Sequence, residues 1–190
     1  MKNKINKFEE LVASFQKLPG VGKKSALKFA YHVSLVDSFS GLNLAHNIED
    51  AISSIKRCSK CGALSENEIC DICIDENRDK DILCIVENPK DILILEESGS
   101  YEGLYFVFDD ISEEFIQKLQ DFILYNKTKE VIFAFTPSIN SDGVILYIED
   151  KLKHLDVNLT KIAQGVPTGV SLDNIDIISL NNAIKYRIKV

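Results

Sequence analysis

The sequence predicts an α/β fold preceded by a helical N-terminal module, and three observations lead to this prediction. Before residue 57, apolar residues recur at spacings of three and four, as on one face of a helix. Two Cys-x2-Cys pairs follow within residues 58–73. From residue 82 onward, apolar runs of strand length alternate with helical patterns. That alternation predicts a parallel sheet covered by helices on both faces.

Length and composition exclude several classes of protein. The chain has 190 residues, of which 45% are hydrophobic, so wholesale disorder is not expected and one medium or two small domains fit. No apolar run approaches the roughly 18 residues that a membrane helix needs. The first residues, MKNKINKFEELV, include no apolar segment of the kind that a signal peptide has. We therefore expect a cytoplasmic protein without a membrane partner.

Charge is distributed unevenly along the chain. Residues 1–57 carry nine Lys and Arg against five Asp and Glu, a net charge of +4. Residues 58–190 carry 13 against 24, a net charge of −11. A basic module joined to an acidic one suggests that the first meets a polyanion, whereas the second would repel DNA. The alternative is a chance asymmetry of the surface.

Three amphipathic helices are expected in the basic module. Their apolar faces are marked by Ile5 to Phe15, by Leu27 to Val36 and by Ala45 to Ile55. A short loop is expected at Ser38–Gly41.

The turn between the first two helices has the sequence Leu-Pro-Gly-Val-Gly-Lys-Lys-Ser, from Leu18 to Ser25. Gly20 and Gly22 allow a tight turn and a close approach to another surface. The free N–H groups that start the next helix suit a phosphate, and Lys23, Lys24 and Lys28 add positive charge. This is the arrangement of a helix–hairpin–helix element, which holds the DNA backbone rather than reading bases. The alternative is a plain interhelical turn with solvated lysines. A nucleotide-binding P-loop is excluded, because the GxxxxGK[ST] spacing is absent.

Four cysteines have the spacing of a metal site, with pairs at Cys58 and Cys61 and at Cys70 and Cys73. Two such turns can place four thiolates around one tetrahedral Zn²⁺, and Gly62 suits the first turn. With four protein ligands no position is left for water, so the predicted zinc, one per chain, is structural. The alternatives are an iron–sulfur cluster or two redox-active pairs. The fifth cysteine, Cys84, lies in an apolar run and is expected in the core.

The second half of the chain predicts the sheet. Strands are expected at 82–86, 104–108, 131–135, 157–163 and 175–180. Helices are expected near 90–97, 115–123 and 144–152. The expected domains are a DNA-binding module at 1–57, a zinc finger at 58–79, an α/β domain at 80–163 and a C-terminal segment at 164–190.

Two acidic residues follow predicted strands. Glu87 ends the first strand, and Asp142 lies beyond the third, with Asn140 just before it. The carboxyl ends of parallel strands form the usual ligand crevice, and carboxylates there could hold Mg²⁺. Two carboxylates are few for a two-metal site, and no nucleophile accompanies them. A non-catalytic sheet edge with capping acids is therefore the favoured interpretation.

The order of these parts resembles the bacterial RecR recombination mediator family. The resemblance is carried by LPGVGKKSALKFAYHV, by the four-cysteine spacing, by CIVENPKDILILEESGSYEGLYFVF, by a Thr-Pro-Ser segment and by AQGVPTGVSLDNID. It covers about residues 5 to 188. It implies a helix–hairpin–helix module, a four-cysteine zinc finger and a Toprim-like domain, with a C-terminal segment that supports subunit association.

The resemblance also implies a function without catalysis. Members of the family form dimers that pair into ring-like tetramers around DNA. With a RecO-type protein, and in some pathways a RecF-type protein, they help RecA load at gaps coated by single-strand-binding protein. On this resemblance Lys23, Lys24 and Lys28 contact DNA, the four cysteines hold zinc, and the corner around Glu87 and Asp142 binds the RecO-type partner.

Several positions depart from the family pattern. Lys23 stands where the family usually has Pro, which makes the turn more basic. The loop SPLDGIGP that usually follows the second Toprim strand is missing, because Asp109-Asp-Ile-Ser112 continues directly into the predicted helix. Asn140 takes the place of the first acid of the Thr-Pro-Ser segment, which weakens metal binding further, and Gln164 stands where a basic or imidazole residue is common.

The sequence as a whole predicts a DNA clamp that mediates recombination. Two other functions remain open at this point. One is a Mg²⁺-dependent Toprim primase, nuclease or topoisomerase that uses Glu87 and Asp142. The other is an adaptor that binds only proteins, in which the hairpin is merely a turn.

Overall fold

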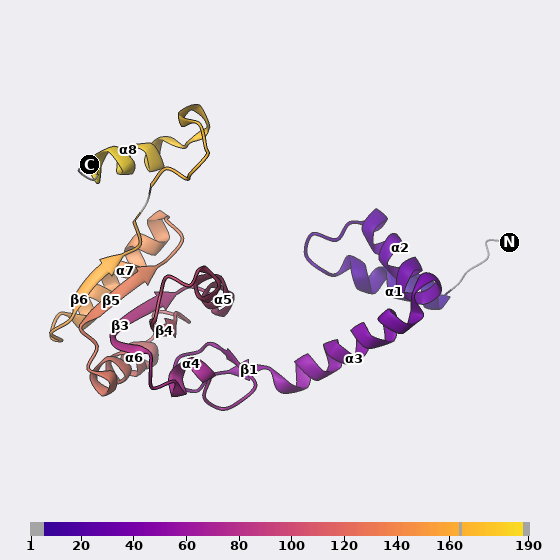
Figure 1. The fold of residues 1–190 in the computed structure, drawn as a ribbon, viewed down its shortest axis with the longest axis horizontal. Coiled ribbons are helices and arrows are strands. Elements are labelled where there is room, and N and C mark those ends of the chain that lie inside the picture. Colours follow the sequence, from indigo (N-terminus) through magenta and orange to yellow (C-terminus); the bar gives the residue numbers. More distant parts are fainter. Residues whose placement is uncertain (1–5, 164, 188–190) are drawn as a thin grey trace. The chain divides into compact units, whose positions relative to one another are not determined.

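The computed structural model of the chain describes residues 6–163 and 165–187. Two compact units make up the chain, Met1–Ile55 and Lys56–Val190 (Figure 1). We refer to them as the N-terminal unit and the C-terminal unit.

The N-terminal unit is helical, as predicted. Its elements are α1 (Asn6–Gln16), α2 (Lys23–Tyr31), the π-helical turn η1 (His32–Val36) and α3 (Ser38–Ser54). The π-helical turn arises because the Asp37 N–H donates to the His32 carbonyl, five residues back. Ile5, expected on the first helix, lies outside the described residues.

The loop predicted at Ser38–Gly41 is wrong, because α3 already begins at Ser38. The Asp37 carboxylate accepts a hydrogen bond from the Ser40 N–H at 2.9 Å and so satisfies one of the free donors of the first helical turn. With this N-cap in place, the polar and glycine residues at 38–41 form the first turn of α3 instead of a loop.

The C-terminal unit begins with a small cysteine-rich region, which we call the cysteine knob (residues 56–75). A short antiparallel ribbon pairs β1 (Lys56–Arg57) with β2 (Leu64–Ser65), and the helical turn α4 (Asp71–Ile74) follows. The sequence patterns predicted none of these three short elements.

A four-stranded parallel sheet forms the body of the C-terminal unit, with the order β4-β3-β5-β6. Its strands are β3 (Asp79–Val86), β4 (Gly103–Val107), β5 (Glu130–Ala134) and β6 (Asn158–Lys161). Three helices connect them: α5 (Pro89–Ser98), α6 (Glu113–Asn126) and α7 (Ile139–Leu152). The predicted α/β class is confirmed.

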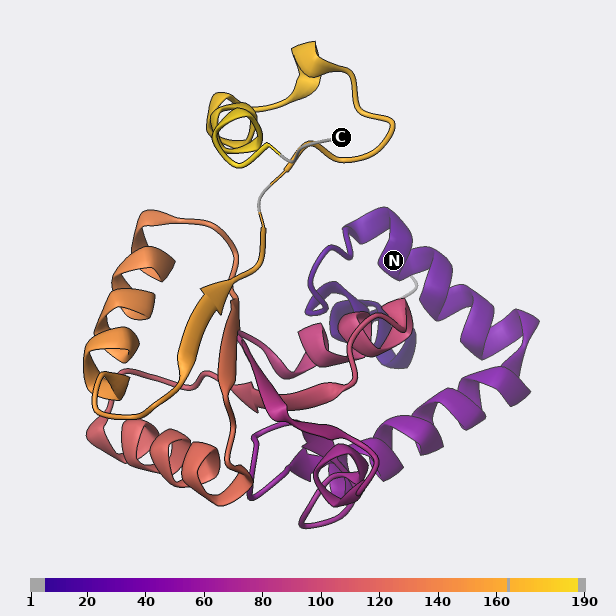
Figure 2. The ribbon, with the colours of Figure 1, turned by 60° about the vertical axis from the view of Figure 1, so that its left-hand side comes forward.

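The helices cover both faces of this sheet. In the sheet, β4 lies on one side of β3, and β5 and β6 lie on the other side. Because the connections between parallel strands are right-handed, α5 packs on one face of the sheet, and α6 and α7 pack on the opposite face. Figure 2 shows α6 and α7 together on one face and α5 on the other. The core between these layers includes Leu83, Ile85, Leu119, Phe133 and Ile148, each at most 1% exposed.

The cysteine knob covers one edge of the sheet. The Val107 N–H of edge strand β4 donates to the Cys61 carbonyl at 2.8 Å. All five residues of β4 are buried, whereas the other edge strand, β6, is mostly exposed. The knob thus occupies hydrogen-bonding groups that an open edge would present to another chain.

The strand predicted at 175–180 is wrong. That segment contains the start of α8 (Ile177–Lys185), after the short 3₁₀ turn η2 (Leu172–Asn174). The Asp176 carboxylate caps α8 by accepting from the Ser179 N–H at 2.9 Å. Among the residues that the structure describes, no helix is long and apolar enough to cross a membrane.

Candidate metal centre and nucleic-acid interface

The four cysteines of the two pairs converge in the cysteine knob. The sulfur atoms of Cys58, Cys61, Cys70 and Cys73 all lie within 4.8 Å of one another, and none is in a disulfide. The Sγ atoms of Cys61 and Cys70 are 3.6 Å apart. Zn–S bonds of about 2.3 Å in a tetrahedron imply S···S distances of about 3.8 Å. The donor set and its spacing therefore fit one tetrahedral metal ion.

Backbone hydrogen bonds shape this cluster. The first pair closes a knuckle in which the Gly62 N–H donates to the Cys58 carbonyl at 3.0 Å. Gly62 has φ +78°, in the left-handed region that glycine adopts without strain. From the second pair, the Cys70 N–H donates to the Cys58 Sγ at 3.3 Å, which joins the two knuckles. Such N–H donors orient metal-binding thiolates and stabilise their charge.

Electrostatics favour a bound cation at this cluster. Without one, hydrogen bonding to Cys70 and burial raise the pKa of the Cys61 thiol, whereas the same hydrogen bond lowers the pKa of Cys70. Closely spaced thiolates, three of them buried, repel one another, so the sulfurs retain protons when no cation is bound. A divalent ion removes that repulsion and binds all four as thiolates.

The hairpin of the N-terminal unit has the geometry that the sequence predicts. Gly20 has φ +76°, which reverses the chain after α1. The Val21 N–H donates to the Leu18 carbonyl at 3.1 Å and closes the turn. Gly22 is the N-cap of α2 in an extended conformation, with no side-chain cap. A Cβ at either glycine would meet no atom within 4 Å, so another molecule can approach this backbone.

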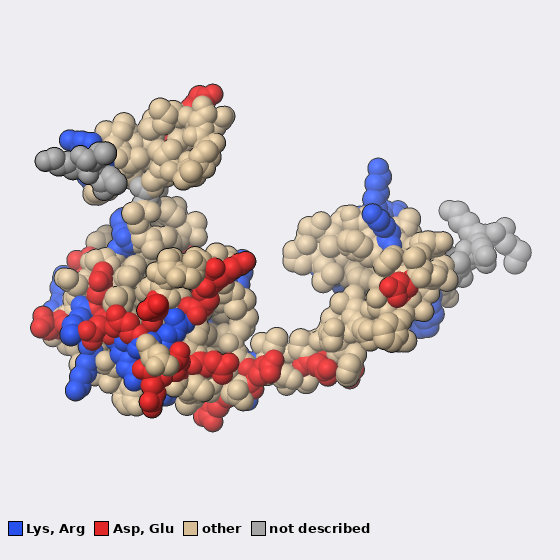
Figure 3. Space-filling view, in the orientation of Figure 1, with Lys and Arg blue, Asp and Glu red and all other residues tan. Residues whose placement is uncertain are grey.

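The lysines around the hairpin are available to a ligand. Lys23, Lys24 and Lys28 are exposed, and none of them forms an ion pair within the described part of the chain. The first turn of α2 has no acidic residue, so its free N–H groups and the lysines add up to a positive field. Figure 3 shows Lys and Arg side chains projecting from the N-terminal unit, which also carries a few acidic groups, and a denser mixture of acidic and basic groups over the C-terminal unit.

Glu87 and Asp142 lie at the carboxyl ends of neighbouring strands, as predicted, but each carboxylate is engaged. The Glu87 Oε2 accepts from the Thr136 N–H at 2.7 Å, which ties the end of β3 to the end of β5. The Asp142 Oδ1 lies 3.4 Å from the Lys161 Nζ, on β6. Asp142 sits in the first turn of α7, not in a loop, because Ser138 and Ser141 form a capping box.

This corner is the switch point of the sheet, where β3 leads to a helix on one face and β5 leads to a helix on the other. Within the described residues, the four cysteines are the one group of three or more possible ligands with metal-binding geometry. Glu87 and Asp142 are therefore not part of such a group among the described residues. Lys161, the partner of Asp142, has no sequence signal, because only the parallel pairing of β6 with β5 brings it there.

A partly buried polar network that the sequence patterns did not indicate links α5 to the sheet. Arg78 forms an ion pair with Glu96, and the Tyr105 hydroxyl donates to Glu96 Oε1 at 2.7 Å. Arg78 also donates to the Tyr101 carbonyl at 3.3 Å. Burial raises the pKa of Tyr105 above its usual range, so the hydroxyl stays a donor.

Comparisons with known proteins agree with both sites. The family model described as RecR, helix-hairpin-helix, matches residues 8–52, and the model for the RecR zinc finger domain with four cysteines matches residues 55–75. The prediction of a zinc cofactor is thereby confirmed.

Three relatives that match nearly the whole length of this chain share the same name. A protein of Campylobacter jejuni (strain 81-176) named Recombination protein RecR is 58% identical over 98% of both chains. Proteins of that name from a Nitratiruptor species and from Helicobacter pylori (strain Shi470) are 53% and 47% identical, covering 100% and 99% of this chain and 100% and 97% of their own length. The chain belongs to the RecR family of recombination proteins.

Proposed function

We propose that this protein is a DNA-binding mediator of recombination and repair that forms a ring-like clamp. With a RecO-type partner, it promotes RecA loading on gapped DNA coated by single-strand-binding protein. The observation that carries the proposal is the hairpin at Gly20 and Gly22, where an open backbone, a helix N-terminus and lysines without ion pairs among the described residues coincide. Membership of the RecR family supports the recombination role.

The surface of the N-terminal unit supports assembly into a ring. Among its described residues only Ala26 and Ala30 are buried. Phe39, Leu42 and Ile52 are each more than 70% exposed, which is unusual for large apolar side chains that do not face a partner. We propose that copies of this chain cover these surfaces in a dimer, and that two dimers close a tetramer. The exposed Ile177 and Ile178 of α8 support an association role for the C-terminal segment.

The acidic corner fits a protein partner better than a reaction. Glu87 and Asp142 are engaged by Thr136 and Lys161, and neither belongs to a described group of three or more possible metal ligands. We propose that it contacts a RecO-type protein, with a RecF-type protein as a further partner, and that the chain is not an enzyme. Cleavage or synthesis on gapped DNA with Mg²⁺ would contradict this.

The remaining assignments follow the same plan. Lys23, Lys24 and Lys28 contact DNA phosphates, and Cys58, Cys61, Cys70 and Cys73 hold one structural zinc. The functional divisions are a DNA-binding module at 1–57, a zinc finger at 58–79, a Toprim-like domain at 80–163 and an association segment at 164–190. A protein that loads RecA onto chromosomal gaps works in the bacterial cytoplasm, at the nucleoid.

The proposal is tested by fluorescence anisotropy of a labelled gapped duplex, with the protein alone and with the RecO-type partner. Replacing Lys23 and Lys24 by Glu is expected to weaken binding on the order of a hundredfold at low salt, because cations at phosphates become repelling charges. The matched control replaces Lys129 and Lys153 by Glu, since both are exposed and already paired with carboxylates. Equal affinity of the two variants would refute the hairpin as the DNA contact.

A second assay tests the mediator role. RecA loading on gapped DNA coated by single-strand-binding protein is followed with the RecO-type partner present. We expect loading to require both proteins and to be lost in the Lys23 and Lys24 variant. Loading at the same rate without this protein would contradict the role, and salt-independent binding to partners alone would favour the adaptor function.

A further inference from the structure

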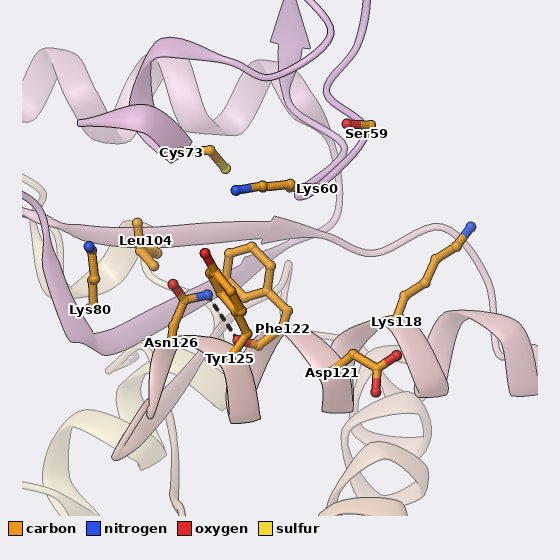
Figure 4. A pocket seen from close by; sticks show the side chains of 10 residues that line it. All are labelled: Ser59, Lys60, Cys73, Lys80, Leu104, Lys118, Asp121, Phe122, Tyr125 and Asn126. Carbon is orange, nitrogen blue, oxygen red and sulfur yellow. Dashed lines mark hydrogen bonds between the residues drawn. The ribbon is translucent and has the colours of Figure 1, made fainter. Parts of the chain in front are cut away.

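We infer that the C-terminal unit carries a second nucleic-acid contact, a pocket that holds one nucleotide, that is, a base with its phosphate, of a single strand. The pocket has a volume of about 530 Å³ and lies between the cysteine knob and α6 (Figure 4). Leu104 of β4 and Phe122 of α6 are buried and give it an apolar wall. The volume is within the range of small-ligand sites in proteins. The inference goes beyond the proposed function, in which DNA is bound by the hairpin of the N-terminal unit, because this pocket lies in the C-terminal unit.

An exposed aromatic ring offers a stacking surface at this pocket. Tyr125 of α6 is 77% exposed, and no other aromatic ring of the described residues packs against it. Figure 4 shows its side chain rising from α6 toward the knob. The Lys60 ammonium lies 5.4 Å from the ring centroid. An exposed tyrosine beside lysines is the combination on which single-stranded nucleic acids stack their bases and bind their phosphates.

Two cations without carboxylate partners line the same pocket. Neither Lys60 nor Lys80 forms an ion pair within the described residues. The third lysine, Lys118, is already paired with Glu114 at 2.7 Å. Figure 4 shows Lys60 reaching across the gap from the knob and Lys80 at one end of it. In a unit with a strong excess of acidic residues, two such ammonium groups at one apolar hollow form a local site for an anion.

The lining favours a nucleotide over an acidic peptide. Asp121 lies on the α6 side, where its carboxylate accepts from the Gln117 amide at 2.9 Å. It repels any anion nearby, so carboxylates spread along a peptide would meet it, whereas a single phosphate can bind on the other side of Tyr125, where Figure 4 shows Lys80. A nucleotide instead concentrates its charge in one phosphate and presents a flat base. Asn126 donates through Nδ2 to the Phe122 carbonyl at 2.9 Å, which leaves its Oδ1 to accept from a base edge. Because the Lys60 side chain is flexible, its ammonium can move from the Tyr125 ring to the phosphate of a bound nucleotide.

Lysine acetylation footprinting of the zinc-loaded full-length protein tests this pocket. The probe is an oligothymidylate of about 15 nucleotides, long enough to span the pocket and its flanks. We expect it to slow acetylation of Lys60 and Lys80 by about fivefold or more, as bound phosphate and base shield both ammonium groups. Lys90, an exposed lysine elsewhere in the same unit, is the internal control and should be unaffected. Unchanged acetylation of Lys60 and Lys80 would overturn the inference.

Variants of Tyr125 separate stacking from simple charge. Tyr125→Ala is expected to abolish the protection of Lys60 and Lys80, whereas Tyr125→Phe keeps it, because the ring supplies the stacking surface. Since Tyr125 is exposed, neither change should unfold the protein, and zinc content is measured to verify this. Equal protection in wild type and Tyr125→Ala would contradict a base-binding pocket.

Two further probes identify the source of the ligand. Protection by thymidine monophosphate as well as by the oligonucleotide supports the pocket and shows that free nucleotides also enter it; protection by the oligonucleotide alone supports it as a strand contact. Protection by polyglutamate but not by the oligonucleotide would replace the inference with a site for acidic peptides.

Lys23 and Lys24 are followed in the same digest. If they are protected while Lys60 and Lys80 are not, the pocket fails and the proposed hairpin contact stands. The reverse pattern keeps the pocket and contradicts the hairpin.

Discussion

The two units of the chain bury their apolar residues to very different extents. In the C-terminal unit, three helices and the cysteine knob enclose a sheet whose central residues, such as Leu83 and Phe133, are at most 1% exposed. In the described N-terminal unit only two alanines are buried, and an apolar hollow of about 280 Å³ lined by Leu11, Phe15 and Leu44 is open. The C-terminal unit thus has its own core, whereas the described part of the N-terminal unit leaves most of its large apolar side chains at least partly exposed.

The same contrast holds for charge. Most lysines on the body of the C-terminal unit lie in ion pairs, among them Lys118, Lys129, Lys151 and Lys153. The lysines of the hairpin have no such partners among the described residues. The hairpin lysines therefore keep their charge available to a ligand, whereas the paired lysines of the C-terminal unit stabilise its surface, with Lys60 and Lys80 among the exceptions there.

Metal removal should have the largest effect, and it should be confined to the C-terminal unit. Replacing Cys58 or Cys70 by Ser removes a ligand of the proposed site, and we expect loss of zinc and a fall in stability of about 5 kcal/mol or more in that unit, because metal binding drives folding of such knuckles. Hydrogen exchange at Val107, whose N–H is bonded to Cys61, should become fast. Amides of α1 to α3 should not change.

The control for this prediction is Cys84→Ala. Cys84 is buried in the sheet and is not part of the cysteine cluster, and burial raises the pKa of its thiol to about 12. Zinc content measured by mass spectrometry should stay at one per chain in this variant. Loss of zinc here, or full zinc in the Cys58 variant, would contradict the assignment.

The difference in burial predicts opposite results for two similar truncations. Leu119→Ala in the core of the C-terminal unit is expected to cost about 2–5 kcal/mol of unfolding free energy. Ile52→Ala, at a residue that is 79% exposed, should cost less than about 0.5 kcal/mol within one chain. It should instead shift the oligomer toward smaller species in sedimentation experiments. An unchanged oligomer would remove the argument that copies of the chain cover this face.

The smallest expected effect is a pH dependence at Glu96. Burial alone would raise the pKa of this carboxyl, but hydrogen bonds from Arg78 and Tyr105 and the charge of Arg78 outweigh it and lower the pKa below its usual value of 4.5. A lowered folded-state pKa stabilises the protein above about 4.5, and this contribution is lost as the pH falls through the folded-state pKa.

We therefore expect Glu96→Gln to lower the Tm by a few degrees at pH 7. At a pH well below 4, where the Glu96 carboxyl is protonated, the substitution should leave the Tm unchanged. The exposed neighbour Glu97 is the matched control, as Glu97→Gln removes the same charge without touching Arg78. A Tm difference for Glu96→Gln that is constant with pH would show that the network contributes only through packing.

The sequence predicted the long elements well, because periodic apolar residues report burial directly. The strands around Ile85, Phe106 and Phe133 and the helices between them all exist. Its two errors, the loop at Ser38–Gly41 and the strand at 175–180, have one physical cause. In both, an Asp caps a helix by accepting from the N–H of a Ser three residues later. Such a cap outweighs a short polar or apolar run, and it was visible in the sequence as Asp-x-x-Ser.

The candidate sites were predictable to different degrees. The cysteine spacing and the two glycines of the hairpin are local signals, so the convergence of the four thiols and the shape of the turn could be anticipated. The partners of Glu87 and Asp142 could not, since Thr136 and Lys161 reach them only through the pairing of β5 with its neighbours. For the same reason no pattern indicated the pocket beside Tyr125, which joins segments that are far apart in the chain.

The salt dependence of binding to a labelled gapped duplex tests most directly the central claim, that the hairpin of the N-terminal unit holds the DNA backbone. The slope of log affinity against log salt counts the phosphates that the protein neutralises. We predict that Lys24→Ala makes this slope shallower by roughly 0.9 for each phosphate that is no longer neutralised, while Lys153→Ala leaves it unchanged. A wild-type slope in Lys24→Ala would contradict the claim.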